Sequence, residues 1–290
     1  MSSAAIPASP ATGTFALRKS QTLSIFWMEL KRNFITKRGF WIYLLAAAPA
    51  VVVWMHSIVT MQRGIRGRHD MPHDTQILAV LFQVFFLRPG VFFGCLGIFT
   101  YLFRGEFVER SLHYYFLAPV RREVLVIAKY FAGAVTAICF FGLAMLATFF
   151  GMYAHYAQFE VNQFLYSGPG LGQLGWYMVI TSLACLAWGS VFLWMGIRFR
   201  NPIIPAVVFL TWESVNAFLP SWLKRVGVLH YLQSLTPVLV QEKGAGALLG
   251  TTEEPEAVVV AIVAPILISV AMLALSVWQL RRTEISYSTD

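Results

Sequence analysis

The sequence predicts an all-α polytopic membrane protein with six transmembrane helices and cytoplasmic N and C termini. Hydrophobic residues make up 58% of the chain, whereas charged residues make up only 12%. The chain contains six apolar stretches of about 20 residues or more, the length that a helix needs to cross a hydrocarbon core of ~30 Å. None of them shows the two-residue alternation of a transmembrane barrel strand, so helices are the remaining way to satisfy the backbone in lipid.

The six predicted spans follow the apolar stretches in chain order. They cover residues 40–61, 77–103, 124–153, 174–197, 203–223 and 258–280. We treat residues 39–282 as one six-span transmembrane domain. The long loop between the last two spans is too apolar for a free linker, and we expect it to form short helices at the outer membrane interface.

The distribution of Lys and Arg predicts the orientation of these spans. Basic residues gather before the first span, after the second, after the fourth and after the sixth, and these loops all lie on one side. Because cytoplasmic loops are enriched in Lys and Arg, both termini are predicted to be cytoplasmic and the protein to lie in the cytoplasmic (inner) membrane. The formal net charge of +8 then anchors the chain to anionic lipid, and no basic patch with exposed aromatics indicates nucleic acid.

The two ends of the chain are predicted to be cytoplasmic tails. Residues 1–22 are mostly small and polar, which favours disorder, and residues 283–290 follow the last span.

Residues 23–38 have the periodicity of an amphipathic helix. Leu23, Trp27 and Phe34 fall on one helical stripe, and Glu29 and Arg32 lie away from it. We expect a helix in the membrane interface that leads into the first span. An ordinary extension of that span is the alternative.

The segment GEFVERSLHYYFLAPVRR, residues 105–122, concentrates charge between the second and third spans. If residues 106–115 are helical, one polar face contains Glu106, Glu109, Arg110 and His113, because side chains at i, i+3, i+4 and i+7 share a face. Pro119 would end this helix. The segment is therefore predicted to be a short amphipathic helix on the cytoplasmic surface, and the alternative is a loop of solvated charges.

The order of residues in this segment resembles that of a known family. The pattern E..ER......L.PV.R......K, from Glu106 to Lys129, is similar to the segment after the second span in permease subunits of type-2 ATP-binding-cassette (ABC) transporters. The ELKR sequence before the first span and an LTP sequence before the last span add to the resemblance. It implies that the charged segment is a coupling helix that docks on a cytoplasmic ATPase subunit.

The same resemblance implies the partners and the contact residues. Two six-span permease chains, identical or related, would pair and bind two ATPase subunits, within membrane lipid. The ATPase subunits would bind ATP and Mg²⁺, and their closure would move the coupling helices. The residues that would contact the ATPase are Glu106, Glu109, Arg110, His113 and Arg122.

The sequence contains no catalytic or metal-binding constellation of its own. A phosphate-binding loop requires G-x-x-x-x-G-K-[ST], and no Gly-Lys pair occurs in the chain, so ATPase activity is expected in another subunit. His69 and His73 lie with acidic residues in an outer loop, but two such histidines predict solvated side chains, and we assign no metal site. No cofactor is predicted in this chain.

Two charges and three glycines inside the spans are further candidates. Arg88 and Glu213 fall near the middle of spans two and five, where an ionised side chain must face protein or water. They could form a structural ion pair or line a translocation path. Gly90, Gly94 and Gly97 allow close approach of another helix, either within one bundle or between two chains.

The function predicted from the sequence is that of a permease subunit of a multi-chain ABC exporter that works by alternating access. A membrane-embedded enzyme that acts on lipid is one alternative, with the charged segment as its head-group site. A non-transporting anchor or assembly subunit of a membrane complex is the other.

Overall fold

A computed structural model describes residues 12–35, 40–62, 70–108, 121–215, 221–238 and 256–282, and within these residues every regular element is a helix. Five helical segments in them are long and apolar enough to cross a membrane: Leu44–Gln62, Met71–Glu106, Arg122–Tyr153, Gly170–Arg198 and Val258–Arg282. The prediction of an all-helical, multi-pass membrane protein is therefore confirmed.

Four predicted spans agree with single helices to within a few residues. These are α2 (Phe40–Gln62), α6 (Arg122–Tyr153), α8 (Gly170–Arg198) and α12 (Val258–Arg282). The predicted fifth span corresponds to α9 (Ile203–Val215), whose 13 residues extend for only about 20 Å. A sixth complete crossing is therefore not confirmed by the described residues.

The second span is longer than predicted and changes helical geometry along its length. It runs without a break through α3 (Met71–Leu81), the π-helix η2 (Phe82–Val91) and α4 (Phe92–Val108). Pro89 lies inside η2, and a proline lacks the N–H that a regular α-helix would use there. The wider π turn accommodates this loss without ending the helix.

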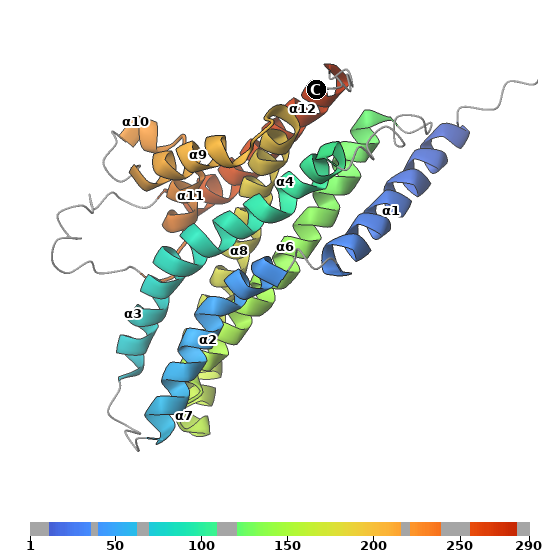
Figure 1. Cartoon of the computed structure of the whole chain (residues 1–290). Coiled ribbons are helices and arrows are strands. Elements are labelled where there is room, and N and C mark those ends of the chain that lie inside the picture. Colours follow the sequence, from blue (N-terminus) through green and yellow to red (C-terminus); the bar gives the residue numbers. More distant parts are fainter. Residues whose placement is uncertain are drawn as a thin grey trace, which may run out of the picture.

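Helix α6 packs against two helices that follow one another along its length (Figure 1). Helix α1 (Thr12–Ile35) contacts its first half, where Asn33 donates a hydrogen bond to Thr136 and Phe34 packs on Phe140. Helix α2 contacts its second half, where Trp54 Nε1 donates to the carbonyl of Ala147 at 3.0 Å. Helices α1 and α2 together cover the whole length of α6.

The bundle has two ends that differ in what lies there (Figure 1). The start of α1 and the end of α12 lie at one end, which we call the basal end. The end of α2, the start of α3 and helix α7 (Gln158–Asn162) lie at the other, which we call the distal end. The distribution of basic residues predicts that the basal end is cytoplasmic.

The prediction for the N-terminal tail changes in detail. Helix α1 begins at Thr12, so residues 12–22, which we predicted to be disordered, are helical. Ala16, Leu17, Arg18 and Lys19 favour helix, and the small polar composition behind the prediction is confined to the residues before them. The predicted C-terminal tail lies outside the described residues.

The loop before the last span contains two short helices, as expected. They are α10 (Ser221–Lys224) and α11 (Val228–Ser234), and α11 packs against α8 and α12. Their predicted position in the outer interface stays a prediction.

Candidate functional site: a buried charge cluster beside the coupling segment

Four charged side chains from three helices meet near the basal end of the bundle. Lys129 Nζ of α6 lies 2.6 Å from Glu29 Oε1 of α1 and 2.6 Å from Glu106 Oε1 of α4. It also donates to the carbonyl of Leu102 at 3.1 Å. Arg32 of α1 completes the group with a 3.2 Å contact to the same oxygen of Glu106. We call Glu29, Arg32, Glu106 and Lys129 the basal charge cluster.

The basal charge cluster is almost closed to solvent. The side chains of Lys129 and Glu106 are 0% exposed and that of Glu29 is 1% exposed, and only Arg32 reaches the surface, at 28%. Burying isolated ions is strongly unfavourable, but here two carboxylates lie beside two cations, so the group can be neutral as a whole. Breaking one contact would leave the remaining ions buried, so the cluster favours one fixed arrangement of the three helices.

Helix α1 reaches this cluster by turning its polar face inward. Glu29 is buried against α6, whereas Leu23, Trp27 and Phe34 are 55%, 52% and 40% exposed. A helix on a soluble protein would do the opposite, but in a bilayer the apolar side faces lipid at no cost. The predicted stripe is thus mostly exposed, and Phe34 at its end also packs on Phe140 of α6.

The residues predicted to contact an ATPase separate into three groups. Glu106 lies in the last turn of α4 and its carboxylate is buried in the basal charge cluster, so we correct its assignment from a surface contact to an internal link. Arg122 lies at the start of α6, where its guanidinium donates to the carbonyls of Leu280 and Arg281 at the end of α12. Glu109, Arg110 and His113 lie outside the described residues.

The three helices of the cluster meet where the charged segment begins and ends. The described part of α4 ends at Val108, two residues after Glu106, and the described chain resumes at 121, eight residues before Lys129. The cluster therefore joins the two helices that flank residues 109–120 and connects both of them to α1.

The chain matches a known protein family over most of its length. Residues 25–215 match the family described as "ABC-2 family transporter protein", and the match includes all four residues of the basal charge cluster. The chain belongs to the ABC-2 transporter family. A search of curated proteins found no match. Family membership places the chain among the membrane components of ABC transporters, as the resemblance in residues 106–129 predicted.

The two mid-span charges of this ABC-2 chain do not form an ion pair with each other in the described structure. Glu213 accepts hydrogen bonds from the backbone N–H groups of Val228 and Leu229, at 2.8 and 3.0 Å, and so caps the start of α11. Arg88 lies in the π-helix η2, and its Nε has no hydrogen-bond partner among the described residues. These hydrogen bonds place the Glu213 carboxylate at a helix N-terminus, where negative charge is favoured. The two interpretations of Arg88 and Glu213, a structural pair or the lining of a translocation path, stay predictions.

Two of the three glycines of span two pack against other helices of the same chain. A Cβ on Gly94 would lie 2.0 Å from the ring of Phe141 in α6, and one on Gly97 would lie 3.4 Å from Ile42 in α2. Gly90 meets only the carbonyl of its own helix, at 3.3 Å. The structure therefore supports helix packing within one chain for Gly94 and Gly97.

A second polar cluster is buried at the distal end. His155 Nε2 lies 3.2 Å from Asp74 Oδ2, and Tyr156 donates to the same carboxylate oxygen at 2.8 Å. On its other side, His155 Nδ1 lies 3.2 Å from Ser57 Oγ. We call Ser57, Asp74, His155 and Tyr156 the distal cluster; it connects α2, α3 and the end of α6.

The distal cluster has the residue types of a hydrolase triad but not the geometry of one. Ser57 is 1% exposed, and its hydroxyl donates to the carbonyl of Gly151 at 2.6 Å. A nucleophile needs access to substrate and a proton directed at its base. Burial and the neighbouring Asp74 carboxylate raise the pKa of Tyr156, so its phenol stays a hydrogen-bond donor. We assign the cluster a structural role.

Sequence reasoning did not find Glu29 and Lys129 as site residues. Lys129 entered the sequence analysis only as the last residue of the family pattern, and Glu29 only as a residue off the apolar stripe and as the first residue of the ELKR sequence. The available signal was the depth of Lys129, because a lysine within an apolar span of 32 residues requires an acidic partner.

Proposed function

We propose that this chain is the permease subunit of a multi-chain ABC exporter, driven by ATP hydrolysis in separate ATPase subunits. Membership of the ABC-2 family supports transport across the membrane. The absence of a G-x-x-x-x-G-K-[ST] sequence supports the assignment of ATP and Mg²⁺ to a partner chain. A second permease chain would complete the pathway, and two ATPase subunits would drive its alternation between inward-open and outward-open states.

The observation that carries the proposed mechanism is the basal charge cluster. In our proposal residues 109–120 contact the ATPase, with Glu109, Arg110 and His113 as contacts, and movement of that segment acts on the ends of α4 and α6. Since Lys129 binds both Glu106 and Glu29, at 2.6 Å each, the ends of α4 and α6 cannot shift separately from each other or from α1 without breaking buried ion pairs. The force would therefore enter the bundle through three helices at once.

The first test separates partner binding from folding. The double variant Glu109→Lys, Arg110→Glu inverts both charges of the predicted contact while conserving net charge. We expect it to lose the ATPase on co-purification and to keep its helical content. The matched control is Glu160→Lys, an exposed carboxylate on α7 at the distal end, which should retain the ATPase. Full retention by the double variant would contradict the assignment.

The second test separates partner binding from transmission. The triple variant Glu29→Gln, Glu106→Gln, Lys129→Met replaces three members of the cluster by neutral side chains, a change that buried ion pairs often tolerate in stability. We expect this variant to bind the ATPase but to show altered ATP hydrolysis in the assembled complex. Unchanged hydrolysis with a bound ATPase would show that the cluster does not transmit movement.

A further inference from the structure

A pocket of about 410 Å³ lies at the distal end, between the last turns of α6 and the segment formed by α7 and the π-helix η3 (Gln163–Ser167). Its volume is within the ~300–1,000 Å³ that small-molecule sites occupy. None of its lining residues belongs to the basal charge cluster or to the coupling segment. The proposed coupling mechanism therefore does not involve this pocket.

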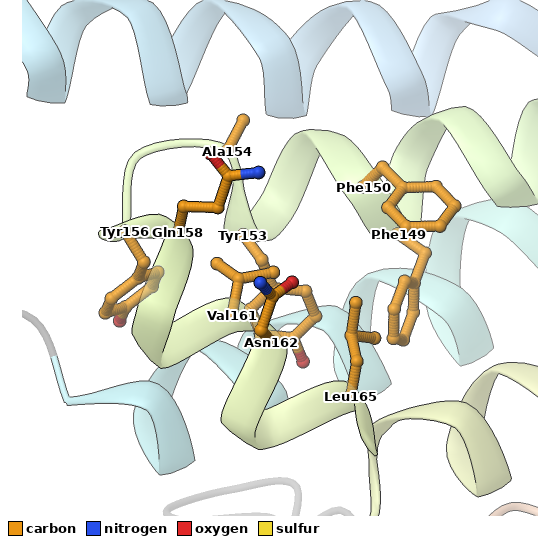
Figure 2. A pocket seen from close by; sticks show the side chains of 9 residues that line it. All are labelled: Phe149, Phe150, Tyr153, Ala154, Tyr156, Gln158, Val161, Asn162 and Leu165. Carbon is orange, nitrogen blue, oxygen red and sulfur yellow. The ribbon is translucent and has the colours of Figure 1, made fainter.

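The pocket is chemically divided along its length (Figure 2). Phe149, Phe150 and Leu165 lie together at one end, and the side chains of Gln158 and Asn162 lie toward the other. In the first group the ring of Phe150 is accessible to an apolar ligand, and Phe149 and Leu165 are buried beside it. The second offers two carboxamides, each of which can donate and accept hydrogen bonds. Such a division fits an amphiphile.

The polar part of that amphiphile should be uncharged. No Asp, Glu, Lys or Arg lines this pocket. Gln158 and Asn162 are exposed, and a charged head group beside them would gain no opposite charge from the residues that line the pocket. Hydroxyl groups, by contrast, match carboxamides in both directions of hydrogen bonding.

The surroundings indicate that the ligand arrives from the membrane. Phe150 is 47% exposed, and the two aromatic side chains on the outer surface of the same segment, Phe159 and Tyr166, are 77% and 76% exposed. Exposed aromatic residues at the end of a membrane helix are typical of the lipid–water interface. The positive-inside distribution predicts that this interface is the outer one.

The distal cluster holds the polar end of the pocket in place. Tyr156 is a lining residue, and its phenol is fixed by the 2.8 Å hydrogen bond to Asp74. Asp74 is in turn held by His155, which is 5% exposed. A wall fixed before binding reduces the ordering that a ligand must impose.

We propose that this pocket binds one lipid of the outer leaflet, with an uncharged, hydroxyl-bearing head group beside Gln158 and Asn162 and an acyl chain against Phe149, Phe150 and Leu165. The proposal is independent of ATPase coupling, because it depends only on the distal end.

A neighbouring pocket is the main alternative binding site for such a lipid. It has a volume of about 540 Å³, shares Tyr156 and is lined by Asp70 and Glu160. These carboxylates would favour a cationic head group and would repel an anionic one. Competition between head groups of different charge therefore distinguishes the two pockets.

The experiment is photo-crosslinking of the full chain in lipid nanodiscs with three probes of equal chain length. The probes carry one diazirine on the alkyl chain and end in a glucoside, a trimethylammonium or a sulfate group. We expect the glucoside to label residues 149–165 most strongly. The double variant Gln158→Leu, Asn162→Leu should reduce that labelling by about tenfold, because it removes both carboxamides that would hydrogen-bond to the head group.

Two controls keep the result interpretable. Gln163→Leu removes a carboxamide that lines only the neighbouring pocket, and it should leave glucoside labelling unchanged. Val161→Trp fills the proposed pocket and should reduce labelling while helical content is kept. Equal labelling by all three probes, or insensitivity to both pocket variants, would mean non-specific partition and would overturn the proposal. Preference for trimethylammonium, abolished by Glu160→Gln, would assign the site to the neighbouring pocket instead.

Discussion

Replacement of Lys129 by methionine tests whether the basal charge cluster holds the bundle together. Methionine keeps much of the length of the side chain but removes its charge, and with it two contacts of 2.6 Å to carboxylates. At an effective dielectric constant of about 20, each contact is worth about 6 kcal/mol of attraction, and the desolvation of the buried ions offsets most of this gain. In the variant the attraction is lost and the desolvation of Glu29 and Glu106 remains. We expect a loss of about 3–5 kcal/mol in the free energy of unfolding.

The assay is reversible unfolding of the purified chain in mixed micelles, followed by helical circular dichroism during a titration with sodium dodecyl sulfate. Lys31→Met is the matched control, because Lys31 is on the same helix as Glu29 but exposed, and its replacement should change stability by less than about 0.5 kcal/mol. The variant Lys129→Met, Glu106→Gln should cost less than the sum of its single changes. A cost for Lys129→Met no larger than that of the control would refute the energetic argument.

Three further predictions concern other contacts. Glu213→Ala should cost about 1–3 kcal/mol by removing the cap of α11, and hydrogen exchange should accelerate at the first amides of that helix. Gly94→Ala should destabilise the bundle by about 1–3 kcal/mol and more than Gly97→Ala in the same unfolding assay, because only the first would meet a buried ring, at 2.0 Å. The pKa of Tyr156 is raised in the folded protein, so the folded state is stabilised below pH 10 and loses this stabilisation as the pH rises toward the raised pKa. Tyr156→Phe should therefore lose less stability above pH 10 than the unchanged protein does.

The sequence was sufficient to predict the helices, because each span is set by local composition. A run of apolar residues as long as a bilayer is thick leaves a helix as the only way to satisfy the backbone, so α2, α6, α8 and α12 could be placed to within a few residues. The fifth span was more difficult. Its apolar run continues to residue 223, whereas α9 is described to Val215, and the hydrogen bonds from Val228 and Leu229 to Glu213 show that the chain returns to this helix.

The partners of the charged residues could not be predicted, because they depend on how the helices pack. Depth in the membrane predicted that Glu213 must face protein or water, but it could not show that backbone N–H groups of a short helix lie against its carboxylate. The same rule applied to Lys129 would have required an acid, but it could not have chosen Glu29 from a helix assigned to the interface. The family pattern named Glu106 and Lys129 together without showing that the two side chains meet.

The pairing of Lys129 with Glu29 changes what helix α1 can be. A helix bound only to the membrane surface could tilt or detach at little cost, because its apolar stripe is in contact with lipid alone. Here Glu29 on its polar face binds the buried Lys129 of α6, and Asn33 donates a hydrogen bond to Thr136 near the middle of α6. Any movement of residues 109–120 that displaced α6 would then have to carry α1 with it or expose three buried ions. If our proposal for the coupling segment is correct, α1 moves together with α4 and α6, and its exposed side chains Leu23 and Trp27 move through the bilayer with it.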